Sequence, residues 1–391
     1  MKLKYSFLTF LIICVLIFTT CASLDADEEE GMVIVEPMIQ TQWAQRSPYN
    51  NMMVNAIRNR TGCGTTAMAQ IMKFYEYPEH GIGQSESYTT GIGTIVPALN
   101  FEATVYDWGN MLNTYSNANS GTDTERNAVA TLMYHAAVGF RINDVPTGRD
   151  GGTTITRMIN AMTTYFGYDK SMQRRSKIYF DDVTWEKIIR DQLDAGMPVF
   201  GHSPGHYYII DGYDNNGKFH FNWGWNGKSD GWYPLSVDWR NLGGDDADSG
   251  EDDDSQNIII NIKPDEGGVS PGYEIGFTSF YVQKTSVIQN EQFEVYVQMK
   301  NINPEHRFLG GTARVELVDN NGNSNVIGTS SMGEGSSWTR LEDRPINCSV
   351  LNTVPKGQYK LRIATRPTGG EWKVATLSIV GVPNSIDFTV R

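Results

Sequence analysis

The stretch TGCGTTAMAQIM, residues 61–72, places a cysteine between two glycines at the start of a helical pattern. Ala67, Ile71 and Tyr75 recur at four-residue spacing, which predicts a helix with one buried face. A helix start offers backbone N–H groups and the positive end of the helix dipole, and both favour a thiolate. A structural cysteine more often lies on an apolar face within an element. We therefore interpret Cys63 as a candidate reactive thiol.

The bulk composition describes an ordinary folded protein that is strongly acidic. The chain has 391 residues, long enough for two domains, and 40% of them are hydrophobic. Its formal net charge of −13 argues against nucleic acid or an anionic membrane surface as a partner. We find no run of Lys and Arg that would form a local basic patch.

Residues 1–21 have the features of an export signal. Lys2 and Lys4 precede an apolar run and then small residues that end at Cys21. The run is short for a membrane-spanning helix. The acidic stretch DADEEE (25–30) resembles the tag that sends some bacterial lipoproteins to the cell surface. We expect lipidation of Cys21 and anchoring at the outer membrane, with cleavage and release as the alternative.

The cysteine count leaves little room for disulfides. Of the four cysteines, Cys14 leaves with the signal and Cys21 would carry lipid. Cys63 and Cys348 then remain, on opposite sides of the predicted domain boundary, so we expect free thiols rather than a disulfide framework. No Cys and His spacing is typical of a metal site, and we expect neither a metal nor a cofactor.

Residues 39–264 follow a pattern of helices and then strands, after the signal 1–21 and a short acidic segment 22–38. Apolar periodicity predicts further helices within 126–140, 153–168 and 184–199. The sequence DNNG (214–217) between two β-rich runs predicts a hairpin, and further strands follow it. We expect an α+β domain with an antiparallel sheet.

A linker at 265–272 precedes a second domain, 273–391, in which short alternating strands predict an all-β sandwich of immunoglobulin type. A spacer or adhesion module is the expected role of this domain. The acidic loop 244–254 is expected to be solvated. Its spacing does not fit an EF-hand, although Ca²⁺ capture or attraction of basic substrates are the alternatives.

Among six histidines, His206 has the best placement for a base that would hold a thiolate. It opens the first hairpin strand after Gly205, where glycine leaves room for a substrate. Antiparallel pairing brings Asn222 toward it, and the Asn222 amide could orient the ring while Trp223 shields their bond from water. From spacing alone, a packed aromatic hairpin without chemistry explains the same residues equally well.

Three separated motifs favour the catalytic interpretation. GCGTTAMAQIMKFYEYPEHG, GHYYIIDGYDNNGKFHFNWGWNGKSDGWYPL and TQWAQRSPYN together resemble the streptopain family of papain-like cysteine peptidases, over roughly residues 40–264. The resemblance implies a papain-like fold and a secreted or surface-anchored cysteine endopeptidase. Such an enzyme hydrolyses protein and peptide substrates through a thiolate–imidazolium pair and an acyl-enzyme.

Carried over residue by residue, the resemblance makes Cys63 the nucleophile and His206 the base. Asn222 falls on the orienting amide and Trp223 on the indole beside it. Gln45 falls on the side chain of the oxyanion hole, where an amide and a backbone N–H would supply two fixed donors.

The resemblance further implies that Gly151, Gly152 and Gly205 line the substrate cleft. It also implies a long inhibitory segment before the catalytic domain. Here only residues 22–38 separate the signal from that domain, so either latency is absent or a separate inhibitor protein holds the enzyme in check. We expect the inhibitor, because an unrestrained exported protease would endanger its own secretion machinery. We expect a monomer.

Two rival functions stay open from the sequence. A surface adhesin on a retained, silent peptidase scaffold would bind without turnover. A transpeptidase or amidase would use the same thiol for acyl transfer to an amine.

Overall fold

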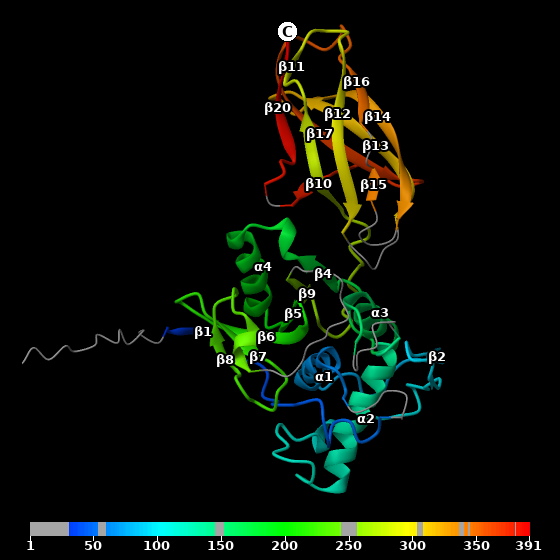
Figure 1. Cartoon of the computed structure of the whole chain (residues 1–391), viewed down its shortest axis with the longest axis vertical. Coiled ribbons are helices and arrows are strands. Elements are labelled where there is room, and N and C mark those ends of the chain that lie inside the picture. The colour runs from blue at the N-terminus through cyan, green and yellow to red at the C-terminus, as the bar shows by residue number, and fades with distance from the viewer. Residues whose placement is uncertain are drawn as a thin grey trace, which may run out of the picture.

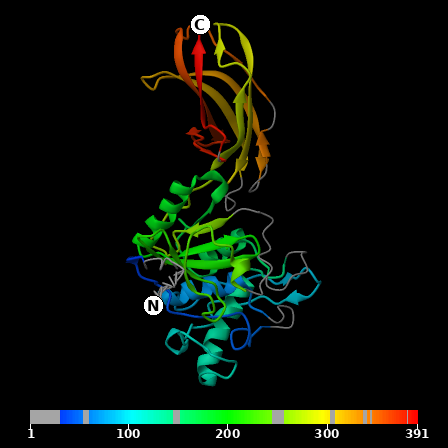
Figure 2. The same cartoon turned by 60° about the vertical axis from the view of Figure 1, so that its left-hand side comes forward.

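The computed structural model describes residues 31–53, 60–144, 152–243, 256–302, 308–335, 340–342, 345–379 and 381–391. Figures 1 and 2 show two bodies stacked along the long axis. The N-terminal part of the chain forms a body of helices and one large sheet. The C-terminal part forms a body of strands that ends at Arg391.

The helices lie where the apolar periodicity predicts them. The α-helices are α1 (Cys63–Tyr75), α2 (Asp123–Gly139), α3 (Ile155–Tyr165) and α4 (Asp182–Asp194). Short 3₁₀ turns are η2 (Trp108–Asn110), η3 (Lys177–Tyr179) and η4 (Trp239–Leu242).

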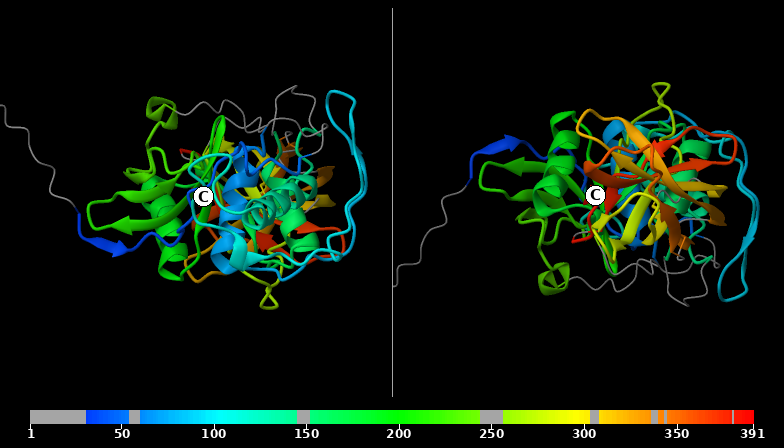
Figure 3. Two further views of the ribbon diagram at one scale, coloured as in Figure 1. Left: turned by 90° about the horizontal axis from the view of Figure 1, so that it is seen from below. Right: turned by 90° about the horizontal axis from the view of Figure 1, so that it is seen from above.

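The large sheet of the first body is antiparallel at every described pairing, as the sequence predicts. Its seven strands run in the order β4-β9-β5-β6-β7-β8, and β1 pairs with β6 off this path. The strands are β1 (Val33–Val35), β4 (Gln173–Ser176), β5 (Val199–Ser203), β6 (His206–Asp214), β7 (Phe219–Asn222), β8 (Gly231–Tyr233) and β9 (Asn257–Ile260). A separate small hairpin joins β2 (Tyr88–Thr89) to β3 (Ile95–Val96) and projects from one side of this body (Figure 3).

Strand β6 is buried on both faces and separates two cores. Alternate side chains of a strand point to opposite faces. Tyr207 and Ile209 therefore join the core that contains α1, α2 and α3. Tyr208 and Ile210 join the core formed with α4. This arrangement explains why all nine residues of β6 are buried.

The second body consists of two sheets around a core of its own. One sheet has the order β15-β12-β10-β19 with β16 beside β12, and the other has the order β11-β20-β17-β13-β14 with β18 beside β17. The strands are β10 (Ile275–Val282), β11 (Ser286–Val287), β12 (Gln292–Asn301), β13 (Phe308–Val318), β14 (Ser324–Gly335), β15 (Arg340–Glu342), β16 (Ile346–Ser349), β17 (Gly357–Pro367), β18 (Lys373–Val374), β19 (Leu377–Ser378) and β20 (Ser385–Val390). The two-sheet arrangement agrees with the predicted sandwich, and its immunoglobulin type stays a prediction.

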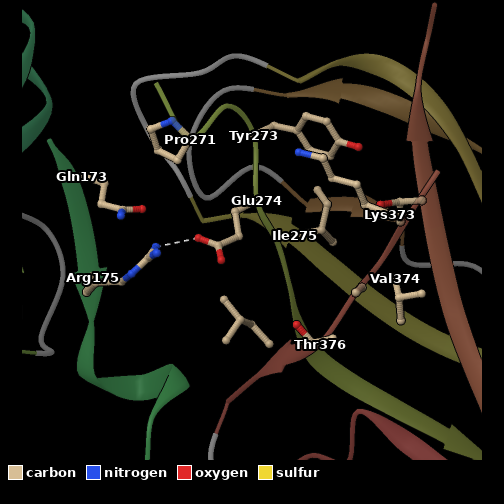
Figure 4. Close-up of a pocket in the computed structure, with 12 residues that line it drawn as sticks. Gln173, Arg175, Pro271, Tyr273, Glu274, Ile275, Lys373, Val374 and Thr376 are labelled. Carbon is tan, nitrogen blue, oxygen red and sulfur yellow. Dashed lines mark hydrogen bonds and ion pairs between the residues drawn. The ribbon is translucent and has the colours of Figure 1, made fainter. Parts of the chain in front are cut away.

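The two bodies meet beside β4. Arg175 of β4 forms an ion pair of 2.6 Å with Glu274, just before β10 (Figure 4). The Tyr179 ring packs so closely on Gly276 that a Cβ there would lie 2.6 Å from it. The carboxylate of buried Asp169 accepts the backbone N–H groups of Glu266 and Gly268, and thereby holds the start of the linker against the first body. The exact domain bounds stay a prediction.

Within the described parts of the chain, we find no helix that combines the length and apolarity needed to cross a membrane.

Candidate active site

The N-terminus of α1 differs from those of the other described α-helices in its cap. Thr122, Thr154 and Asp181 each cap their helix by accepting a backbone N–H bond from the residue three positions later. Helix α1 instead begins after Gly62, whose φ of 87° lies in the region that favours glycine, and no side chain caps it. Cys63, 4% exposed, is its first residue. The thiol thus lies at the positive end of an uncapped helix, where a negative charge is stabilised.

The segment with Gln45 runs alongside this helix start. The backbone N–H of Thr61 donates to the Gln45 carbonyl at 3.0 Å. One turn further along α1, the Thr66 hydroxyl donates to the Ala44 carbonyl at 3.4 Å. Gln45 is buried, and its backbone carbonyl is bonded beside the thiol-bearing turn. Its role as an oxyanion donor stays a prediction.

The first turn of α1 packs against the start of β6. A Cβ on Gly64 would lie 3.0 Å from the Tyr207 ring and 3.2 Å from the sulfur of Met158. Only a glycine fits here without displacing a neighbour, and this lets the helix approach the strand closely. Cys63 and His206 directly precede these two packed residues in their elements. The pairing of their side chains stays a prediction.

The His206 ring is fully buried among aromatic side chains. Its centroid lies 4.8 Å from that of Trp225, 5.2 Å from Trp239 and 6.1 Å from Trp223. Its Nε2 lies 3.0 Å from the Trp223 carbonyl oxygen. A carbonyl oxygen only accepts, so Nε2 carries the proton of this bond. In the neutral ring, the lone pair that can accept a proton then lies on Nδ1.

Asn222 bonds to several segments around the site. It pairs with Ile209 in the sheet. Its side chain bonds to Gln70 of α1, to the Thr41 carbonyl and to the Gly224 N–H. The described contact to His206 comes from the carbonyl of the next residue, Trp223. Direct orientation of His206 by the Asn222 amide stays a prediction.

Comparison with known proteins places this geometry in a family. The model of the peptidase C10 family matches residues 43–233. Streptopain of Streptococcus pyogenes is 31% identical over 216 residues, which are 52% of this chain and 52% of the relative. The solved structure of active wild-type interpain A cysteine protease from Prevotella intermedia is 31% identical with a TM-score of 0.50, and the match covers 58% of this chain and 94% of that one. The chain belongs to the peptidase C10 family.

The match to a third relative extends over both bodies of this chain. The thiol protease/hemagglutinin PrtT of Porphyromonas gingivalis is 27% identical over 380 residues, 93% of this chain and 42% of the relative. The chain spans about half the length, or less, of these curated relatives.

The predicted substrate-binding glycines have structural roles of their own. Gly205 has a φ of 93° and lies in the tight turn between β5 and β6, where Ser203 pairs with His206. Gly152 is buried, and its carbonyl accepts the N–H of Asn143. Their part in substrate binding stays a prediction. Gly151, the lipidation residue Cys21 and the acidic loop 244–254 lie outside the described residues.

Both described cysteines are free thiols, in agreement with the sequence. Cys348 is buried in the second body, and this burial raises its pKa to about 12. A thiol held neutral in this way is unreactive at neutral pH. Cys63 is therefore the candidate nucleophile that this family member offers among its described residues.

An acidic residue that no sequence pattern reveals contacts Trp223. Asp230 accepts the Trp223 backbone N–H at 2.9 Å. Burial, chiefly, raises its pKa to about 6, opposed by this bond and the nearby His220, and supported by Asp211. The SDGW stretch around Asp230 is typical of a simple turn, so the sequence carries no signal for this contact.

We predict that Asp230 makes the stability of the protein fall as pH rises through about 6. Its folded-state pKa lies above the ordinary value, so its full contribution is present below about pH 4 and is lost as the carboxyl ionises. Asp230→Asn stays neutral and keeps an oxygen for the Trp223 N–H. In a Cys63→Ala background, urea unfolding at pH 4.5 and 7.5 should show the variant gaining stability over its parent at the higher pH, by at most about 3 kcal/mol. An equal difference at both pH values contradicts this prediction.

Proposed function

We propose that the chain is an exported cysteine endopeptidase that hydrolyses peptide bonds through Cys63 and His206. One observation supports this most strongly. The uncapped first turn of α1, with Cys63, packs against the first residues of β6, with His206. Membership of a family that includes interpain A, a cysteine protease, supports the same conclusion.

The first step needs a proton acceptor and a place for negative charge. In the proposed mechanism, Cys63 transfers its Sγ proton to Nδ1 of His206, while Nε2–H stays bonded to the Trp223 carbonyl. The thiolate attacks the substrate carbonyl carbon, and the carbonyl oxygen becomes an oxyanion. The Gln45 amide and the Cys63 backbone N–H would donate to that oxygen, and one such donor typically contributes about 2.7–4 kcal/mol.

The two later steps return the site to its starting state. As the carbon–nitrogen bond breaks, His206 gives its Nδ1 proton to the leaving amine, and a thioester to Cys63 remains. Water then loses a proton to His206 and attacks the thioester. Departure of the acid restores the thiol and the neutral ring.

We also propose a location and an organisation for this enzyme. The signal pattern of residues 1–21 supports export, and Cys21 before the acidic stretch supports a lipid anchor. The peptidase domain would comprise residues 39–264, and an immunoglobulin-like sandwich, 273–391, would act as a spacer. Protein and peptide substrates, a separate inhibitor protein and a monomeric state complete this proposal.

A binding role for the sandwich is a second candidate function. The match to the Porphyromonas gingivalis protein named thiol protease/hemagglutinin includes 93% of this chain, so it reaches beyond the peptidase part. Adhesion by the second body would be compatible with catalysis by the first.

We predict stoichiometric labelling of Cys63 by a thiol-reactive epoxide, with parallel loss of peptide hydrolysis. Cys348 serves as an internal control, because its buried, neutral thiol should stay unlabelled. His206→Ala should slow labelling and lower kcat by at least about 10²–10⁴-fold. Mass spectrometry of the intact protein measures the labelling, and mass spectrometry of the peptide products measures the hydrolysis. A folded wild type that neither reacts nor cleaves would leave the adhesin as the better account.

Cys21→Ser tests the anchor. We expect the wild type in the outer-membrane fraction and the variant in the soluble or culture fraction, because a serine cannot receive the thioether-linked lipid. Immunoblots of fractionated cells measure this. Equal release of both proteins would support cleavage and release instead.

A further inference from the structure

A fully buried glutamine connects three segments of the site. Gln70 lies on α1, seven residues after Cys63, so nearly two helical turns place both on the same face. Its Oε1 accepts from the Thr41 hydroxyl and from the Trp43 N–H, each at 3.0 Å. Its Nε2 donates to the Asn222 Oδ1 at 3.0 Å. One carboxamide on the helix of the thiol thus bonds both to the segment before Gln45 and to the end of β7.

Backbone groups fix how both amides are oriented. The Trp43 N–H can only donate, so the atom of Gln70 that faces it must be oxygen. The Gly224 N–H likewise requires the Asn222 oxygen, at 3.1 Å, and the Thr41 carbonyl requires the Asn222 nitrogen, at 2.8 Å. The Gln70 nitrogen then donates to an oxygen whose position is already set.

The Asn222 oxygen also forms a turn around Trp223. A side-chain oxygen that accepts from the N–H two residues later closes an Asx-turn. The residue inside this turn is Trp223, and its carbonyl accepts from Nε2 of His206. The orientation of the His206 ring therefore depends on Gln70 through Asn222 and the Trp223 carbonyl.

The other side of the carboxamide acts on the predicted oxyanion donor. Thr41 and Trp43 precede Gln45 by four and two residues in a segment outside the regular strands. Their bonds to Gln70 hold that segment against α1, and the bond from the Thr61 N–H to Gln45 continues the contact. The position of the Gln45 amide is thus coupled to the same buried side chain.

We propose that Gln70 is a positioning residue that sets the geometry of His206 and Gln45 together, relative to Cys63. This inference rests on the proposed peptidase function. Gln70 does not reach the substrate; it acts through Asn222 and through the segment 41–43. Displacement of reacting groups by about 1 Å can cost about 10²-fold in rate, so its loss should affect kcat far more than KM.

The test compares Gln70→Met with a matched control. Methionine keeps the length of the side chain and removes the hydrogen bonds to Thr41, Trp43 and Asn222. We expect kcat to fall about 10- to 100-fold, KM to change less than about 3-fold, and alkylation of Cys63 to require a higher pH than in the wild type. Gln192→Met removes a comparable amide on α4, whose oxygen accepts the Asn261 N–H. This control should leave kcat and the alkylation profile unchanged.

Further variants keep the proposal testable if Gln70→Met does not fold. Gln70→Glu keeps the shape of the side chain and the acceptor for Trp43 and, once ionised, loses the donor to Asn222, so kcat should fall. Gln45→Ala sets the size of the effect expected from the oxyanion donor alone. Asn222→Ala combined with Gln70→Glu should cost less than the product of the two single effects, because the residues act as one unit.

The outcomes separate this inference from the proposed function. If the wild type cleaves peptides and the Gln70 variants lose melting temperature but keep kcat and the alkylation profile, Gln70 is merely structural and the proposal is wrong. If the wild type itself has no turnover and no reactive Cys63, the peptidase function fails first. A drop in kcat with an unchanged melting temperature supports the proposal most strongly.

Discussion

The close approach of α1 to β6 is the constraint on which the rest of the site depends. Gly64 lets the helix start lie against the Tyr207 ring, and Gly62 supplies the backbone conformation in which the helix begins without a side-chain cap. The thiol therefore lies at the positive end of an uncapped helix, near the strand that carries His206. A larger residue at position 64 would separate the two elements. The chemistry proposed for this chain requires that they stay together.

Buried hydrogen bonds give the site its rigidity. Leaving a buried polar group unpaired typically costs about 1–3 kcal/mol, so the partners of Gln70, Asn222 and Trp223 restrict one another. Backbone carbonyls and N–H groups supply most of these bonds, and backbone cannot be changed by substitution. The main-chain carbonyl of Trp223 bonds to His206, and the side-chain amides of Asn222 and Gln70 hold that carbonyl in place.

The sequence predicts the elements well and their connections less well. Periodicity locates α1 and the β6–β7 hairpin because each follows a local rule of spacing or turn chemistry. Strand β14, Ser324–Gly335, consists largely of small or polar residues, so apolar alternation does not mark it. The stretch FYVQKTSV (280–287) reads as one alternating segment, but it divides between β10 and β11. The role of Gln70 lies in contacts between segments far apart in the chain, so no local pattern reveals it; a polar residue on a buried apolar helix face is the one available signal.

The most direct test of the account is the pH dependence of Cys63 alkylation by an uncharged haloacetamide, measured in the wild type and in His206→Ala. If His206 holds the sulfur as a thiolate, the wild-type rate should stay nearly constant from about pH 8 down to about pH 6. The rate in the variant should fall about tenfold per unit below the usual thiol range of about pH 8.5. Identical profiles, both falling below about pH 8.5, would contradict the central claim that the imidazole ionises this thiol.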